Sequence, residues 1–379
     1  MFVVAAGLII PSTEAATAYK HMVVTGYVPE YRTGIDWNFY AQHLTDLILF
    51  SVEPLADGTI KSYFPIDDDG PASALTKAQE AKKRSIGSSH LLPNSNGINL
   101  LLCVGGAGRS GHFSTITSTK EKRTFFLNIL LQILKDKNLN GVDFDWEVPS
   151  TRKELHQYQL LLQDAKLLLH DKHQFLVTAT VHAWQDLGAL AYQSVNRVHL
   201  MSYDSQGGGG ETHSTYQTSI QDIERLIASK CPASKIVLGV PFYGRGISNP
   251  GMVLTYQDLV NKVGADMNPT SDYLGSGVNK IGFNNILTVQ KKFKVCIKKK
   301  IAGMFAWEIG QDSSDPKTSL TKAISDVRLG IKRSKRFQKI NPREDPRFKK
   351  KLKKEQLDGE GVAGMMKKKK RRIKRNFDL

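Results

Sequence analysis

The chain has 379 residues, 40% of them hydrophobic, and a formal net charge of +17. This length suits two average domains or one large barrel, and the apolar content is enough for a large buried core. Residues 331–379 contain 20 basic and 6 acidic side chains and therefore carry +14 of the charge. The remaining +3 excludes a strongly basic folded part, so nucleic acid is not expected as its partner.

An apolar run over residues 2–10 opens the chain and is followed by the small residues Ala16, Thr17 and Ala18. The run is too short to span a bilayer but suits a secretory signal cleaved after Ala18, although no Lys or Arg precedes it. We therefore expect residues 1–18 to be a signal peptide and the protein to be secreted, with no membrane span.

Eight apolar runs rich in Val, Ile and Leu follow, and amphipathic segments of helical period separate them. Buried strands that alternate with helices favour a parallel sheet, and eight such units favour one closed (β/α)8 TIM barrel of the α/β class, over residues 19–330. In this architecture the loops after the strands form the site. The eight runs cover residues 23–27, 44–52, 98–106, 141–147, 175–181, 197–203, 235–243 and 301–307.

Residues 118–137 are one of the predicted helical segments. Ser118 and Glu121 have the spacing of a capping box, which predicts that the helix begins at Ser118. The apolar stripe that we expect to face the barrel comprises Phe125, Phe126, Ile129, Leu130 and Ile133.

The fourth run carries three carboxyl groups at alternating positions, Asp143, Asp145 and Glu147. Side chains alternate across a strand, so all three point to one face, and Pro149 ends the strand near Glu147. Carboxylates this close cannot all stay ionised, so one should hold a proton near neutral pH, as a general acid requires. A solvated edge strand is the first alternative, but Val, Phe and Trp flank the acids. A metal site is the second, but no further acids or His residues stand at ligand spacing.

The DFDWE segment at 143–147 resembles the DxDxE signature of the family 18 glycoside hydrolases, the chitinase-like enzymes. The resemblance extends over the chain from about residue 22 to about residue 328. Further segments similar to that family are Gly26–Tyr27, Cys103–Gly106, Met201–Asp204, Tyr243–Arg245 and Gly303–Trp307.

The resemblance implies retaining hydrolysis of chitin-type polymers of β-1,4-linked N-acetylglucosamine, in which the substrate acetamido group is the nucleophile. Glu147 would be the general acid and base. Asp145 would orient the acetamido group, Asp143 would share a proton with Asp145, and Tyr203 would donate to the acetamido carbonyl. Tyr27 would reach Asp143, and Arg245 would line the cleft. The substrate-binding residues that the resemblance implies are Tyr27, Asp204, Trp307, Arg245, Gly105 and Gly106. No metal or other cofactor is implied.

Two positions depart from the family pattern. Asn140 stands where the family usually has Asp, but it serves the same turn and should have little effect. Cys103 stands where the family usually has Ser, and a thiol is a weak hydrogen-bond donor. We therefore expect Asp143 to be less stabilised as an anion, with lower activity or a shifted pH range.

Only about sixty residues separate the seventh run from the eighth, and they should hold a loop and a helix near residues 285–300. This looks too short for the extra α+β insertion that gives some family members a deep cleft, so we expect no large insertion domain, a shallow groove, and internal rather than end-on cleavage. Cys231 and Cys296 precede the last two strands, and they either form a disulfide or remain buried thiols.

Residues 331–379 lack apolar periodicity, so we expect a disordered basic tail. Its cluster at 367–375 is typical of nuclear import or polyanion binding, and a solvated appendage is the alternative. Nuclear import conflicts with the signal peptide. Secretion is favoured because a chitin-type substrate is extracellular.

Three rival functions stay open. A sugar-binding, lectin-like barrel is one, although the presence of Glu147 favours an enzyme. An endo-β-N-acetylglucosaminidase acting on N-linked glycans would use the same acetamido chemistry. A polyanion-binding protein that acts through its tail would show a steep dependence of binding on salt. We expect the protein to be a monomer.

Overall fold

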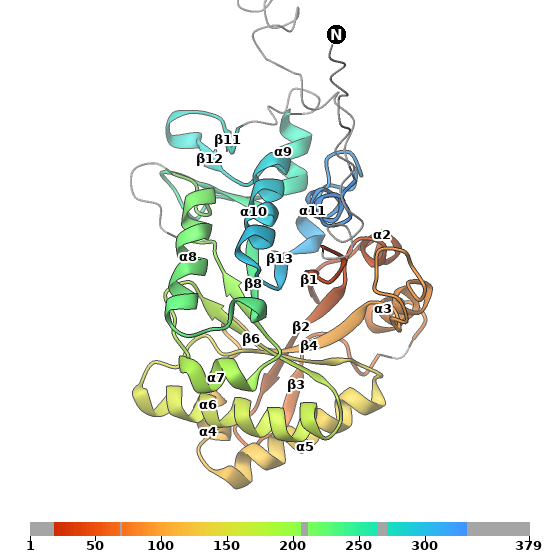
Figure 1. Ribbon diagram of the computed structural model, residues 1–379, viewed down its shortest axis with the longest axis vertical. Coiled ribbons are helices and arrows are strands. Elements are labelled where there is room, and N and C mark those ends of the chain that lie inside the picture. The colour runs from red at the N-terminus through yellow and green to blue at the C-terminus, as the bar shows by residue number, and fades with distance from the viewer. Residues whose placement is uncertain (1–18, 69, 206–210, 264–270, 332–379) are drawn as a thin grey trace, which may run out of the picture. The chain divides into compact units, whose positions relative to one another are not determined.

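The computed structural model describes residues 19–68, 70–205, 211–263 and 271–331. At its centre eight parallel strands form a ring, and each strand comes from one of the eight apolar runs (Figure 1). The (β/α)8 barrel predicted from the sequence is confirmed. The predicted signal peptide and the basic tail beyond residue 331 lie outside the described residues. The barrel strands are β1 Val23–Pro29, β2 Asp46–Pro54, β4 Asn99–Gly105, β5 Gly141–Asp145, β6 Leu176–His182, β7 Arg197–Met201, β8 Ile236–Pro241 and β13 Gly303–Trp307.

The barrel closes because β1 has a parallel partner on each side. Residues 23–26 lie in register with residues 303–306 of β13, and residues 25–29 lie in register with residues 46–50 of β2. The other strands follow from β13 in the order β8, β7, β6, β5, β4 and β2. Because all eight strands are parallel, their C-terminal ends meet at one mouth, where a barrel places its site.

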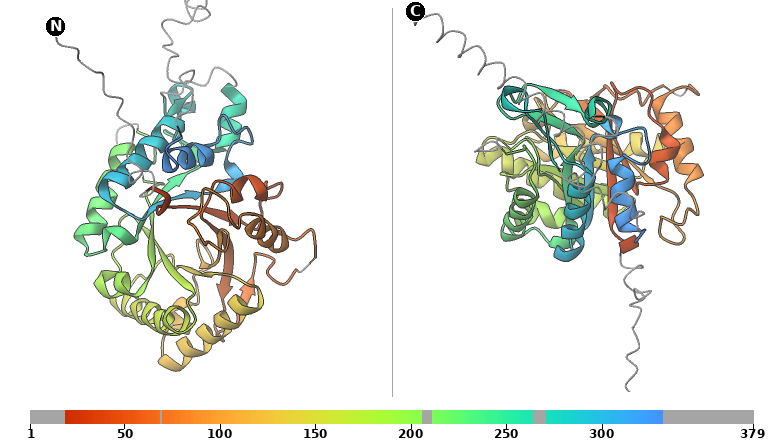
Figure 2. Two further views of the ribbon diagram at one scale, coloured as in Figure 1. Left: turned by 45° about the vertical axis from the view of Figure 1, so that its right-hand side comes forward. Right: turned by 90° about the horizontal axis from the view of Figure 1, so that it is seen from above.

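Helices surround the ring, as the view in Figure 2 shows. The strands send alternate side chains outward to these helices and inward to the lumen, which gives a large outer core and a smaller inner one. The helices are α2 Trp37–Ala41, α3 Ala74–Arg84, α4 Phe113–Ile116, α5 Lys120–Asp136, α6 Arg152–Ala165, α7 Gly188–Ser194, α8 Tyr216–Ala228, α10 Ile286–Lys299 and α11 Leu320–Arg328. The short strand β3 Ile60–Ser62 pairs antiparallel with β2.

Helix α5 differs in detail from the predicted helix. Its N-cap is Thr119, whose side chain accepts from the Lys122 N–H, and not Ser118. Phe125, predicted to be buried, is 52% exposed. The buried face of α5 is therefore shifted by about one position from the predicted stripe. Apolar side chains occupy almost every position from 125 to 134, and for this reason periodicity alone does not select a face. The residues that α5 buries are Arg123, Phe126, Leu127, Leu130 and Leu134.

The segment between β8 and α10 holds more than the expected loop and helix. Its described residues form a small antiparallel sheet, in the order β10, β9, β12 and β11, next to a helix, α9 Tyr256–Val263. The expectation that this segment is too short for an α+β insertion is therefore wrong, although the insertion is small. Its residues 245–248 line a hollow that adjoins the cleft described below. The groove therefore has a wall on this side and is not uniformly shallow. The strands are β9 Tyr243–Gly246, β10 Val253–Thr255, β11 Tyr273–Leu274 and β12 Ile281–Gly282.

The sequence left open whether Cys231 and Cys296 form a disulfide. Cys103, Cys231 and Cys296 are all buried free thiols, so the latter two form no disulfide.

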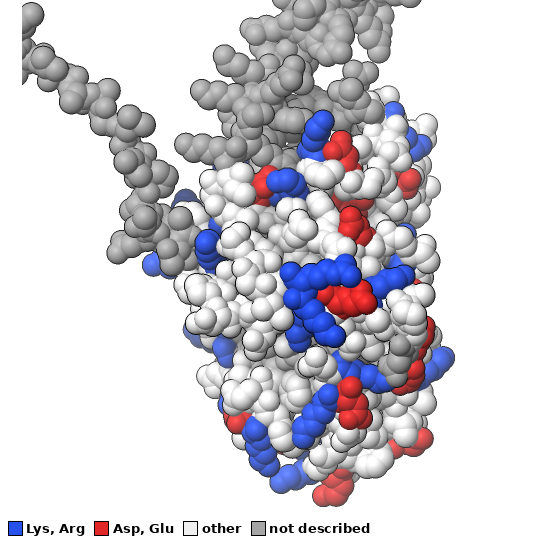
Figure 3. All heavy atoms as spheres, turned by 90° about the vertical axis from the view of Figure 1, so that its right-hand side faces the viewer, with Lys and Arg blue, Asp and Glu red and all other residues white. Residues whose placement is uncertain are grey.

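The surface of the barrel carries charges of both signs. On the face shown in Figure 3, acidic and basic side chains are intermixed, which agrees with the small net charge outside the tail. Within the described ranges, no helix is long and apolar enough to cross a membrane.

Candidate active site

Strand β5 carries the predicted row of carboxyl groups to the mouth of the barrel. Asp143 and Asp145 lie within the strand, and Glu147 lies two residues beyond its end. Trp146 points the other way and stacks on Phe113, with ring centroids 5.1 Å apart. Its packing against the helix layer turns the alternate side chains of this segment toward the lumen.

Asp143 is fully buried, and hydroxyl groups surround its carboxylate. Its Oδ2 accepts from the Tyr27 hydroxyl at 2.8 Å and from Thr180 Oγ1 at 3.0 Å, while Oδ1 accepts from Thr178 Oγ1 at 2.5 Å. His199 Nδ1 lies 3.4 Å from the same Oδ1. Buried polar atoms need hydrogen-bond partners, and these three hydroxyl groups supply them to both oxygens of Asp143.

The Cys103 thiol adds a weak donor to this set. Burial, followed by the charge of Asp143, raises the pKa of Cys103 well above its usual range, so the thiol keeps its proton. Because three hydroxyl groups already serve Asp143, we expect the thiol to cost the carboxylate less than the sequence alone suggested.

Asp145 is 4% exposed, and its Oδ1 has no hydrogen-bond partner among the described residues. Burial raises the pKa of Asp145 well above its usual range, and the charges of Glu147 and Asp143 raise it further. Asp145 can therefore hold a proton, and one of its carboxyl oxygens is left unpaired beside the cleft.

The backbone next to Asp145 requires glycine, since a Cβ on Gly105 would lie 2.3 Å from the Asp145 carbonyl oxygen and Gly106 has a φ of +93°.

Glu147 faces a cleft of about 160 Å³ at the mouth of the barrel. Its backbone N–H donates to Ser110 Oγ at 3.0 Å, and its Oε2 lies 3.0 Å from His182 Nε2. Asp143, Gly105, Gly106 and Arg245 do not line this cleft. The predicted site residues that do line it are Tyr27, Asp145, Glu147, Tyr203, Asp204 and Trp307.

Aromatic rings form much of the cleft floor. The Trp307 ring meets the Phe50 ring edge-on at 4.8 Å and the Tyr27 ring at 5.6 Å between centroids. Burial raises the pKa of Tyr203 well above its usual range, so its hydroxyl stays protonated and can donate. The cleft thus combines carboxyl groups, a phenol and an apolar surface, which is a suitable lining for a sugar ring.

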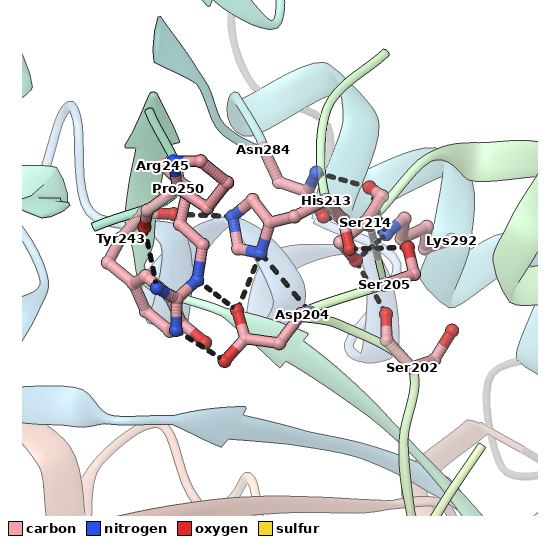
Figure 4. A network of polar contacts seen from close by, with 10 residues as sticks. All are labelled: Ser202, Asp204, Ser205, His213, Ser214, Tyr243, Arg245, Pro250, Asn284 and Lys292. Atoms are coloured by element: carbon pink, nitrogen blue, oxygen red, sulfur yellow. Dashed lines mark hydrogen bonds and ion pairs between the residues drawn. The ribbon is translucent and has the colours of Figure 1, made fainter. Parts of the chain in front are cut away.

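Asp204 occupies one end of the cleft and belongs to a polar network (Figure 4). Arg245 binds both of its carboxylate oxygens, with Nε 2.5 Å from Oδ1 and Nη2 2.7 Å from Oδ2. His213 Nδ1 lies 3.0 Å from Oδ1. Burial alone would raise the pKa of Asp204, but the bonds from Arg245 and His213 outweigh it and hold that pKa below its usual range. Arg245 and Asp204 also line an adjoining hollow of about 490 Å³, so the cleft extends in this direction.

A family model decides what kind of site this is. Residues 24–312 match the model described as glycosyl hydrolases family 18. The chain belongs to this family. It is a chitinase-like glycoside hydrolase, and the resemblance noted in the sequence is confirmed.

Individual relatives agree with the family assignment. Nod factor hydrolase protein 1 of Medicago truncatula is 28% identical over 273 residues, which are 59% of this chain and 71% of the relative. Class V chitinase CHIT5 of Lotus japonicus is 25% identical over 268 residues, 57% of this chain and 67% of the relative. The solved group IV chitinase of Ostrinia furnacalis has the same fold, with a TM-score of 0.67 at 20% identity over 81% of this chain and 99% of that one. A chitinase-like agglutinin of Robinia pseudoacacia has it too, with a TM-score of 0.65 at 19% identity over 80% and 98% of the two chains.

In this family 18 chain, a buried lysine holds Ser214 in place beside the end of β7. Lys292 of α10 is fully buried, and its Nζ donates to Ser214 Oγ at 2.8 Å, to the Ser214 carbonyl at 2.9 Å and to Asn284 Oδ1 at 2.7 Å. Ser214 Oγ in turn donates to the carbonyl of Ser202, two residues before Asp204. Burial lowers the pKa of Lys292 to about 7.

Lys292 predicts a pH-dependent stability. The unfolded chain holds this proton up to about pH 10.5 and the folded chain only to about pH 7, so stability should rise as pH increases from 7. Between pH 7 and pH 9.5, unfolding in urea should show that the native chain gains on the order of 3 kcal/mol relative to Lys292→Met. Lys291→Met, at an exposed neighbour, is the matched control. A constant difference between native and Lys292→Met would refute the low folded pKa of Lys292.

Sequence reasoning missed several residues of the site. Thr178, Thr180 and His199 alternate along β6 and β7 and point inward, but they were counted only as strand formers. Their alternation with Val and Leu was the available signal. Ser110 and His213 lie in loops, where no periodicity reveals which way a side chain points.

Proposed function

We propose that this chain hydrolyses β-1,4-linked N-acetylglucosamine polymers with retention of configuration, using the substrate acetamido group as nucleophile. The observation that carries the proposal is that Asp145 and Glu147 face the same cleft, with Tyr203 and Trp307 on its walls. The names of the relatives support chitin as the polymer, since several of them are chitinases.

Glu147 is the proposed general acid and base. It would protonate the glycosidic oxygen, so that the acetamido carbonyl oxygen attacks the sugar carbon and an oxazolinium ion forms. The Glu147 carboxylate would then take a proton from the water that opens this ion. Its position at the rim, 20% exposed, gives both the leaving group and a water molecule access to it.

Asp145 is the proposed partner of the acetamido group. One of its carboxyl oxygens lacks a partner, and accepting a hydrogen bond from the acetamido N–H would remove this deficit. The bond would also turn the carbonyl oxygen toward the reacting carbon, and the carboxylate would balance the positive charge of the transition state. Asp143 would share a proton with Asp145, and Tyr27 would hold Asp143 in place.

The remaining residues would bind the sugar. Tyr203 would donate to the acetamido carbonyl, and Trp307 would lie under the apolar face of the ring. Asp204, held by Arg245, would accept from sugar hydroxyl groups. Gly105 and Gly106 act through the backbone, by leaving room for Asp145 to approach.

Internal cleavage is the proposed mode of action. The hollow beside Arg245 extends the cleft beyond the reacting centre, so several sugars of one chain can lie along it. The small insertion walls this side without the bulk of a large domain. Secretion and a monomeric state remain proposals as well.

Two other functions remain candidates. An endo-β-N-acetylglucosaminidase would use the same carboxyl pair on N-linked glycans. A sugar-binding role is favoured by the fold shared with the agglutinin from Robinia pseudoacacia. The presence of Glu147 at the rim of the cleft supports hydrolysis over binding alone.

A chitin hexamer tests the proposal directly. The native chain should release dimers, trimers and tetramers, and NMR should show the β-anomer first, as retention requires. The fully deacetylated hexamer should resist cleavage because it lacks the nucleophile. Release of the α-anomer first, cleavage of the deacetylated chain or release of dimers alone would each contradict one part of the proposal. Cleavage of N-linked glycans but not of the hexamer would favour the first rival.

A further inference from the structure

His182 is the last residue of β6, and its ring stands directly beside Glu147. Its Nε2 lies 3.0 Å from Glu147 Oε2, and the ring stacks on Trp184 with centroids 5.4 Å apart and planes 11° from parallel. The backbone N–H of His182 donates to Gln185 Oε1 at 3.1 Å. The His182 ring thus lies between the Trp184 indole on one side and the Glu147 carboxyl group at its Nε2.

The other titratable side chains that line the cleft around His182 are carboxyl groups and phenols. The titratable groups that line the cleft with it, among the described residues, are Tyr27 of β1, Asp145 and Glu147 at the end of β5, and Tyr203 and Asp204 just after β7. Arg245 and His213 are engaged with Asp204. No lysine or arginine lines the same cleft in the described part of the chain, so His182 is the basic group placed to pair with Glu147.

We propose that His182 is a positioning residue for Glu147 which, in its charged form, stabilises the Glu147 carboxylate and so confines hydrolysis to more acidic solutions. This inference rests on the proposed function, because it concerns the acid of that reaction. The contact with His182 occupies Oε2 of Glu147 and leaves Oε1 of Glu147 to meet the glycosidic oxygen.

The sign of the pH effect follows from the contact. A cation within hydrogen-bond distance of a carboxyl group favours the ionised form. Glu147 therefore gives up its proton at a lower pH while His182 is charged, and the enzyme loses its general acid earlier as pH rises. The alkaline limb of kcat/KM reports this loss in the free enzyme. Removing the charge should move that limb to higher pH.

Three substitutions separate charge from position. His182→Gln keeps a side-chain N–H but not the charge, and it should raise the alkaline limb by about one pH unit. At pH values above both limbs at which the native His182 is still charged, its fraction of maximal kcat/KM should then exceed the native fraction by about tenfold. His182→Lys keeps a cation and should keep the native limb. His182→Phe lacks both features, so its limb should rise and its maximal kcat should fall by about tenfold.

The control is His173→Gln, an exposed histidine in the turn before β6. Its profile should match the native one, and the melting temperatures of all variants show whether they are folded. If the native chain is active and the limb stays in place in both His182→Gln and His182→Phe, the inference is wrong while the proposed function stands. A limb that rises equally in His182→Lys would also overturn it, since the charge would then be irrelevant. An inactive native chain would instead contradict the proposed function, and the inference with it.

Discussion

Glu147→Gln should lower kcat on a chitin oligosaccharide by about 10³-fold, because the amide has no proton to give to the leaving group. Glutamine has the shape of glutamate, and its amide can still bind His182 Nε2, so the cleft should keep its form. Calorimetry should therefore find that the variant binds the uncleaved hexamer with nearly native affinity. The measurements are initial rates of hydrolysis and the dissociation constant for the same oligosaccharide.

A matched substitution separates this effect from a general loss of charge. Glu80→Gln removes a carboxylate on the surface of α3, where it forms an ion pair with Arg84 one turn away. Its rate should be native, since such surface pairs contribute little. If Glu147→Gln hydrolysed at more than a tenth of the native rate, another group would have to be the acid. If the native chain bound the hexamer without cleaving it, the sugar-binding alternative would be favoured.

The fold was predictable from the sequence because the side-chain types of a segment indicate where the buried strands lie. Runs such as residues 44–52 and 98–106 are short and rich in Leu, Ile and Val, which favours a buried strand, and both form one. Helix faces were less predictable. In α5, apolar residues lie all round the helix, and the packing of the neighbouring helices selects the buried side.

The carboxyl row was predictable for the same local reason, since alternation along one strand determines which side chains share a face. What surrounds each carboxyl group was predicted only in part. The family resemblance implied Tyr27 beside Asp143, but nothing pointed to the threonines or to His199. The donors to Asp143 come from β1, β6 and β7, so their convergence depends on barrel closure and not on any spacing within one segment. The contact between His182 and Glu147 also joins two strands. Contacts of this kind need the register of the sheet, which sequence patterns do not supply.

Asp145→Asn should lower kcat by about 10²-fold and at the same time make the folded protein more stable at neutral pH. The asparagine carbonyl can still accept from an acetamido N–H, but it lacks the charge that balances the transition state. The stability gain follows from the raised pKa of Asp145 in the folded chain. In the unfolded chain, Asp145 loses its proton as pH rises above its ordinary pKa of 3.8. In the folded chain its pKa is higher, so the proton stays on to a higher pH. The free energy of unfolding of the native protein therefore falls as pH rises from 3.8 toward the folded pKa.

Melting temperatures at several pH values check this prediction beside the rates. The two proteins should differ little below pH 3.8, and Asp145→Asn should gain as pH rises, by about 2–4 °C for each kcal/mol. Asp67→Asn is the control, because the Asp67 side chain is 84% exposed and its loss should change neither rate nor melting temperature. A melting temperature of Asp145→Asn that never exceeds the native one would refute the raised pKa of Asp145. A native rate would refute its role with the acetamido group. A lower kcat together with a higher melting temperature would mean that the carboxyl group needed for the reaction also destabilises the folded chain. Buried catalytic acids often have this property.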